Sequence, residues 1–226
     1  MAALGLGTSE AALVGVNFQS DGYGFGPYTP TTSAFGVPGA NWINLAPGVS
    51  GSGSNSGATA SYSAAGSWVS FGYAYANVGA GPTNDNERVL AGNIWGDNGA
   101  PIVVTLDLGA PGNYTYSLTA IASQDSGSGF INPVINDGAG ITSPGWGATT
   151  QGGLWNGANT SPMAMLSQSG TTTGDTITFT ITGPNAAGGI RNALAGLTID
   201  FTPVPEPGTA ALGAIGALAL LSRRRK

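Results

Sequence analysis

Hydrophobic and polar residues alternate in short runs along most of this chain. The strictest run is Asp175–Thr182, in which Ile177, Phe179 and Ile181 alternate with threonines. A period of two places the apolar side chains on one face of a strand and the hydroxyls on the other. The same pattern, less strictly kept, predicts strands at Leu13–Gln19, Ala58–Ser63, Ser67–Ala76, Arg88–Trp95, Pro101–Leu108, Asn113–Ser123, Phe130–Asn136, Ser161–Ser169 and Gly196–Thr202.

Turn residues indicate how these strands connect. Gly109-Ala110-Pro111-Gly112 separates Pro101–Leu108 from Asn113–Ser123, which predicts a hairpin at the centre of the fold. In that second strand Tyr114, Tyr116, Leu118 and Ala120 are expected to share one face. Pro133 favours an edge position for Phe130–Asn136, because proline cannot donate to the ladder.

A long segment rich in Gly, Pro, Ser and Asn, Ser20–Gly57, carries no comparable strand pattern. An unstructured loop of that length is unusual inside a compact domain. We expect its spaced aromatic residues to hold it on the body as an ordered cover. These residues are Tyr23, Phe25, Tyr28, Phe35 and Trp42.

The predicted fold is all-β, a jelly-roll-like β-sandwich of about eight to ten short strands. A short hydrophobic helix is expected after it. Residues 13–202 would form the sandwich and residues 203–226 a separate C-terminal signal. Residues 1–12 are interpreted as the remnant of a signal peptide, with Ser9 and Ala11 at the small positions of a cleavage site. The alternative is a disordered N-terminus.

Charge changes this picture by excluding several function classes. Residues 1–203 contain ten acidic residues and only Arg88 and Arg191 as bases, a formal net charge of −8. Such a body lacks the basic surface that nucleic-acid phosphates require. The chain has no Cys and no His, and its single lysine is Lys226. A Ser or Thr nucleophile would therefore lack its usual base, and we expect no catalytic residue, no cofactor and no enzyme activity.

The acidic residues suggest two kinds of oxygen-rich site. Asp85 and Glu87, with Asn84 and Asn86 between and beside them, could supply calcium ligands, but the spacing is not that of an EF-hand loop. Solvated turn acids are the commoner explanation, and we assign no metal site. Paired carboxylates for glycoside hydrolysis are disfavoured because the acids are few and scattered.

Four tryptophans lie in or beside loops and are candidates for stacking on sugar rings: Trp42, Trp95, Trp146 and Trp155. The competing and favoured interpretation is that they seal loops over the core.

The C-terminus carries the densest signal in the chain. Val204-Pro205-Glu206-Pro207 is followed by the uncharged run Gly208–Leu221 and by four basic residues. The prolines favour an extended backbone. Fourteen helical residues would span about 21 Å, short of the ~30 Å hydrocarbon core. The basic cluster, expected to stay cytoplasmic, comprises Arg223, Arg224, Arg225 and Lys226.

This tail resembles the PEP-CTERM sorting signal of Gram-negative bacteria, whose three parts it matches in order. The resemblance implies recognition by exosortase, a transient inner-membrane anchor, cleavage near Pro205-Glu206-Pro207, and release or attachment at the cell surface. An ordinary C-terminal anchor or a buried apolar helix is the alternative.

The body resembles, more weakly, galactose-binding-like jelly-roll domains, at Val14–Phe18, Val103–Ile121 and Asn192–Ile199. Together these features predict an exported, non-catalytic protein of the cell surface or of an exopolysaccharide or biofilm matrix. The alternative is a secreted carbohydrate-binding module.

Overall fold

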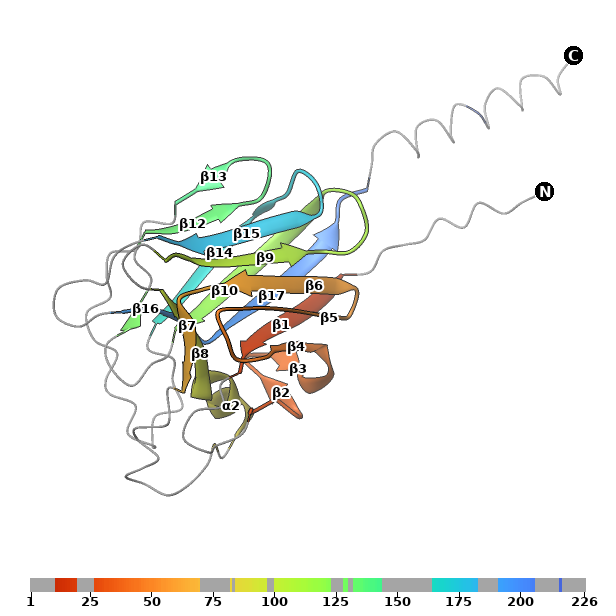
Figure 1. The fold of residues 1–226 in the computed structure, drawn as a ribbon. Helices are drawn as coiled ribbons and strands as arrows, with labels where there is room; N and C mark the ends of the chain where they lie inside the picture. Colours follow the sequence, from red (N-terminus) through yellow and green to blue (C-terminus); the bar gives the residue numbers. More distant parts are fainter. Residues whose placement is uncertain are drawn as a thin grey trace, which may run out of the picture.

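The computed structural model describes residues 11–19, 27–69, 82, 84–96, 100–122, 128–129, 132–143, 164–182, 191–205 and 216. Within these ranges the chain is built mainly from strands, which form two large sheets and two smaller ones (Figure 1). The predicted all-β sandwich is confirmed. The expected C-terminal helix falls outside these ranges, apart from Gly216.

The first large sheet has the strand order β14-β10-β17-β1-β4. Its pairs are antiparallel except β1 with β4, which is parallel. β17 therefore lies inside the sheet, between β10 and β1. The strands are β1 (Ala12–Phe18), β4 (Trp42–Leu45), β10 (Tyr114–Ala122), β14 (Ala164–Thr171) and β17 (Gly196–Pro203).

The second large sheet has the order β13-β12-β15-β9-β6-β5, with every pair antiparallel. Its strands are β5 (Ser50–Asn55), β6 (Ala58–Ser63), β9 (Ile102–Asp107), β12 (Pro133–Asn136), β13 (Ile141–Thr142) and β15 (Thr176–Ile181). Pro133 opens β12, where a missing N–H is tolerated. The predicted edge position is wrong by one strand, because the two-residue β13 pairs with the outer side of β12.

Smaller elements close one end of the sandwich. A four-stranded sheet has the order β11-β16-β8-β7, and a two-stranded ribbon pairs β2 with β3. These elements are β2 (Ser33–Ala34), β3 (Val37–Pro38), the 3-10 turn η2 (Gly39–Asn41), β7 (Gly66–Val69), α2 (Asp85–Ala91), β8 (Gly92–Gly96), β11 (Ser128–Gly129) and β16 (Arg191–Leu194).

The core lies between the two large sheets. Ile177, Phe179 and Ile181 are buried, as the alternation predicted. They pack in one cluster with residues of the other sheet, among them Leu118 and Phe201. Burial of apolar surface of this kind is the main favourable term in folding, at about 25 cal/mol per Å².

The predicted hairpin at 101–123 is wrong. β9 pairs with β6 and β15, whereas β10 pairs with β14 and β17, so the connection at 108–113 crosses from one sheet to the other. The predicted shared face of β10 is correct, because Tyr114, Tyr116, Leu118 and Ala120 are all buried. The apolar faces of β9 and β10 meet across the core, and alternation alone cannot distinguish this from pairing side by side.

The strand predicted at Arg88–Trp95 is also partly wrong. Residues 85–91 form α2, and the strand β8 begins only at Gly92. The helix starts at Asn84, whose side-chain Oδ1 accepts a hydrogen bond from the Glu87 N–H at 3.0 Å. Asn three residues before Glu is a helix-start signal, so the interpretation of these residues as turn acids is wrong.

The stretch 20–57 was predicted to contain no strands, yet β2, β3, β4 and β5 lie within it. β5 has no apolar side chain, because Gly51 and Gly53 occupy its inward positions. A Cβ at Gly51 would lie 2.8 Å from the Tyr62 ring, and one at Gly53 would lie 3.1 Å from Ile43. Large neighbours fill the space that side chains would need, so the strand carries no hydrophobic pattern.

Three of the predicted cover aromatics are described, and the cover is confirmed for Phe35 and Trp42, whereas Tyr28 is half-buried outside their cluster. Phe35 and Trp42 belong to a second cluster with Ala34, Val37 and Val89. Trp42 is 3% exposed, and its Nε1 donates to the Val37 carbonyl oxygen at 3.2 Å. Its indole ring lies over Gly15 of β1, where an added Cβ would be 2.5 Å away.

We therefore predict that Gly15→Ala lowers the free energy of unfolding by about 2 kcal/mol, because the added methyl group overpacks the indole ring. Urea denaturation curves measure this. Gly140→Ala is the matched control, since nothing lies within 4 Å of its Cβ position. Its change should stay within about 0.5 kcal/mol. Equal stability of the two variants would contradict the close packing of β1 on Trp42.

Candidate functional site

The C-terminal signal begins where β17 ends. β17 reaches Pro203, and the Val204 N–H donates to the Asn113 carbonyl oxygen at 2.8 Å. Val204 is half-buried and Pro205 is exposed. The fold thus holds the backbone up to Val204, and the sorting-motif residues Pro205, Glu206 and Pro207 follow directly; the last two lie outside the described residues.

We use the name tail-proximal end for the three connections around this exit: residues 108–113, 137–140 and 172–175. Figure 1 shows β17 ending beside the β9–β10 connection, at the end where the chain also turns after β12 and β14. The N-terminal end of β1 lies here too, because Ala12 pairs with Phe201.

Hydrogen bonds join the three connections to one another. The Asn113 side chain accepts from the Gly174 N–H at 3.0 Å, and the Leu108 N–H donates to the Asp175 carbonyl at 2.8 Å. The Thr173 N–H donates to the Asp137 carbonyl at 2.9 Å. Since each connection is bonded to another, this end of the sandwich is held as one unit.

The Asp137 carboxylate secures one of these turns. Oδ1 accepts from the Ala139 and Gly140 N–H groups at 3.1 and 3.2 Å. Oδ2 accepts from the buried Tyr116 hydroxyl at 3.0 Å. Burial, followed by the hydrogen bond to Asp137, raises the pKa of Tyr116 far above its ordinary value. The hydroxyl therefore remains a proton donor at physiological pH, and the pair serves structure.

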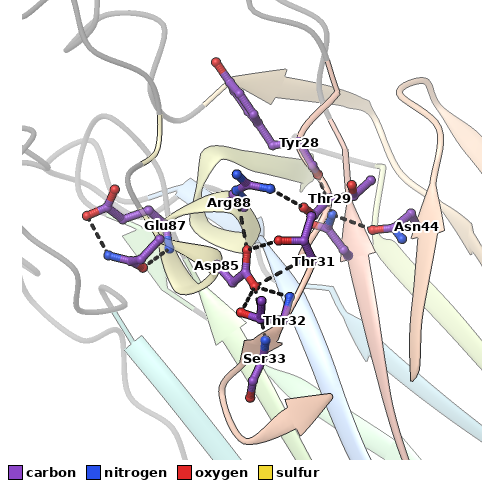
Figure 2. A network of polar contacts seen from close by, with 11 residues as sticks. Tyr28, Thr29, Thr31, Thr32, Ser33, Asn44, Asp85, Glu87 and Arg88 are labelled. Carbon is purple, nitrogen blue, oxygen red and sulfur yellow. Dashed lines mark hydrogen bonds and ion pairs between the residues drawn. The ribbon is translucent and has the colours of Figure 1, made fainter. Parts of the chain in front are cut away.

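A second polar cluster surrounds Asp85, which with Glu87 was one of the two candidate calcium ligands (Figure 2). Oδ2 accepts from the backbone N–H groups of Thr31, Thr32 and Ser33 at 3.1, 2.6 and 3.1 Å, and from the Thr32 hydroxyl at 2.7 Å. Oδ1 accepts from the Thr31 hydroxyl and lies 3.4 Å from Nε of Arg88. Donors occupy both carboxylate oxygens, so this side chain binds a loop rather than a cation.

The electrostatics agree with that role. Burial alone would raise the pKa of Asp85, but the hydrogen bonds from Thr32, Thr31 and Ser33 outweigh it and lower the pKa from 3.8 to about 2. Arg88 also donates to the Thr29 carbonyl at 3.1 Å. Asp85 and Arg88 together fasten the segment before β2 to α2. In the described part of the chain, no group of three or more His, Cys, Asp or Glu side chains is arranged to hold a metal ion.

Of the four candidate stacking tryptophans, the two that the structure describes, Trp42 and Trp95, are not brought together. Trp42 is buried under the cover, so it offers no open ring to a sugar. Trp95 is half-buried on β8, with its Nε1 only 3.0 Å from the Cβ position of Gly66. Trp146 and Trp155 lie outside the described residues, as does the basic cluster Arg223–Lys226.

A shallow hollow that was not predicted from the sequence lies on the outer face of the first sheet. Its volume is about 200 Å³, and it lies between β10 and β17. Thr115, Ser117, Asp200 and Thr202 supply its polar side chains. Only the pairing of β10 with β17 brings these residues together, so no local sequence signal could have identified them.

We predict that Asp85→Asn lowers the free energy of unfolding by about 2 kcal/mol at pH 7, because a neutral amide replaces a carboxylate in a nest of donors. The folded-state pKa lies below the unfolded one. The stabilisation that the Asp85 carboxylate contributes is therefore complete above pH 5 and is lost as pH falls toward 2.

Urea denaturation at several pH values measures both effects. The native chain should lose about 2 kcal/mol over that window through Asp85, and Asp85→Asn should lack this loss. The exposed Asp200→Asn is the control and should follow the native profile. An Asp85→Asn variant with the native stability and acid profile would contradict the assigned role.

Comparison with known proteins confirms the sorting signal predicted for the tail. Residues 203–226 match the model of the PEP-CTERM protein-sorting motif. No curated protein and no solved structure matches the chain, so the galactose-binding-like likeness of the body stays a prediction. In the described residues no helix is long and apolar enough to span a membrane; the run 208–221 lies outside them except for Gly216. The chain carries a PEP-CTERM sorting signal, which implies export, a precursor anchored in the membrane at its C-terminus, and processing by exosortase.

Proposed function

We propose that the processed sandwich is a non-catalytic structural protein of the cell surface or of an extracellular polysaccharide matrix. The observation that carries this proposal is the chemistry of the two outer sheet faces. Serine and threonine supply most of the outward side chains of β14, β10 and β17 in the first sheet and of β15, β9, β6 and β5 in the second, with one carboxylate on each face, Asp200 and Asp107. The outer face of β1 and β4 lies instead under the cluster that contains Trp42.

Strand register sets these hydroxyls in rows. On the first sheet, Thr202 pairs with Thr115 and Thr115 with Thr171, and one such row lies beside the next. Nine outward positions of β14, β10 and β17 carry a hydroxyl or a carboxylate: Ser167, Ser169, Thr171, Thr115, Ser117, Thr119, Thr198, Asp200 and Thr202. Met165, at the start of β14, is an exposed apolar residue on the same face. Thr119 and Ser167 also bond to each other at 2.8 Å.

The second sheet repeats the arrangement. Thr178 pairs with Thr105, which pairs with Ser61, which pairs with Ser52. Hydroxyl groups both donate and accept hydrogen bonds. Such faces match the chemistry of neutral polysaccharide hydroxyls and carry little charge to repel acidic polymers. Four described carboxylates, on Asp85, Glu87, Asp107 and Asp137, bind the protein's own loops or side chains, which favours a structural over a catalytic use.

Replacing Pro205, Glu206 and Pro207 together by alanine tests the sorting route. In a host with exosortase, we predict that the native body leaves the membrane and is recovered with the extracellular polymer without residues 208–226. The triple variant should stay in the membrane fraction with its tail. Fractionation with an epitope in the body and another after Lys226 measures this.

The matched control is Pro101→Ala, an exposed proline outside the motif, which should be processed like the native chain. Processing of the triple variant at the native rate would overturn the sorting route. A native body that is released but never associates with polymer would overturn the matrix role alone.

The hollow at Asp200 favours a second candidate function, the binding of a defined glycan. A carboxylate beside three hydroxyls can bond several sugar hydroxyls at once. If so, Asp200→Asn should weaken binding to a glycan identified on an array by about tenfold. Asp107→Asn, on the opposite face, is the control. An array that gives no signal with the native body would exclude this function.

A further inference from the structure

The anchored precursor has a very short tether between its fold and the membrane. Val204 is bonded to Asn113, and only Pro205, Glu206 and Pro207 separate it from the apolar run that begins at Gly208. Four Cα steps span at most about 14 Å, even in a fully extended chain. The tail-proximal end therefore cannot lie farther than this from the start of the apolar run.

Membrane dimensions make that limit restrictive. The headgroup layer occupies about 5–7 Å on each side of the hydrocarbon core. A helix over the fourteen residues 208–221 would be about 21 Å long, so both of its ends are drawn toward the ~30 Å core. Less than about 10 Å is then left between the headgroups and the fold. This gap is no wider than the ~10 Å separation of two packed sheets.

We infer that the tail-proximal end is the face of this protein that lies against the membrane surface in the anchored precursor. This inference rests on the proposed sorting route. Because the three connections of this end are bonded together, they approach the bilayer as one surface. Residues 109–112 of that surface are small and largely exposed: Gly109, Ala110, Pro111 and Gly112. A processing enzyme that reaches residues 205–207 meets this same surface.

Charge indicates that the tether, and not attraction, produces this contact. Asp175 lies at the tail-proximal end and Asp107 directly precedes it at the end of β9, and neither is buried. The two bases that precede the tail, Arg88 and Arg191, lie elsewhere, on α2 and β16. Acidic groups repel anionic headgroups within a Debye length of about 8 Å at physiological salt. Lengthening the tether should therefore let this end move away from the surface.

The absence of cysteine from the chain permits a direct test on the full-length protein. Ala110→Cys places a fluorescent label at the tail-proximal end. Met165→Cys is the matched control, since Met165 is 41% exposed and pairs with Ile121. Ile121 lies seven residues along β10 from Tyr114, about 24 Å away. Each labelled chain is reconstituted in phosphatidylethanolamine–phosphatidylglycerol vesicles that contain a headgroup-level quencher lipid.

The label at Ala110 should be quenched several-fold more than the label at Met165. Inserting a twelve-residue Gly/Ser linker between Val204 and Pro205, with a root-mean-square length of roughly 20 Å, should remove most of that difference. Circular dichroism checks that the four proteins share one fold.

Equal quenching at the two positions, in chains that float with the vesicles, would overturn the inference and leave the sorting route intact. Persistent quenching at Ala110 in the linker variant would show that this end binds lipid by itself, which contradicts a contact imposed by the tether. A chain that does not float with the vesicles would overturn the anchored precursor, and the inference with it.

Discussion

The pairing of β17 between β10 and β1 is the constraint on which the rest of this molecule depends. The last strand of the body is held by backbone hydrogen-bond ladders on both sides. Directly after it, the Val204 N–H donates a hydrogen bond to the Asn113 carbonyl oxygen. An interior strand cannot leave the sheet without losing both ladders at once, so the fold determines the position of the C-terminal signal. The same pairing aligns Asp200 and Thr202 with Ser117 and Thr115, which creates the hollow on the outer face. The strand β17 thus positions the processing signal, contributes to the exposed outer face and supplies part of the core.

This low-charge, glycine-rich sequence forms its fold through specific local contacts. Where other proteins use large apolar side chains, Gly51 and Gly53 let Tyr62 and Ile43 pack directly on the backbone of β5. Where disulfides are absent, Asp85 and Asp137 bind loop N–H groups with buried carboxylates. Such bonds are strong because the acceptor is charged and the donors are already oriented. The consequence is a body whose few described acids largely serve its own turns, while its outer faces carry one carboxylate each and are rich in hydroxyls.

Sequence reasoning succeeded where a pattern is local. The alternation at Ile177, Phe179 and Ile181 identified a core strand, and the order of proline, apolar and basic residues after Pro203 identified the sorting signal. It failed where the decisive interaction is distant. Whether β9 lies beside β10 or across the core from it depends on strand partners that are 40 to 89 residues away in the sequence. β5 contains no apolar residue that would reveal it as a strand. The helix at Asp85 was missed although Asn84 and Glu87 signal its start. For Trp42 the favoured interpretation as a cover was correct, and Gly15 leaves room for its ring. The Asp200 hollow lay beyond any local pattern.

The most direct test of the account uses cells that contain exosortase and express this protein. The protein is recovered from outside the cells, and the mass of its C-terminal peptide is measured. The account predicts that this peptide ends near Pro205–Pro207 and that residues 208–226 are missing. Extracellular protein that still ends in Arg225-Lys226 would contradict removal of the signal, and with it the route by which this sandwich reaches its place of action.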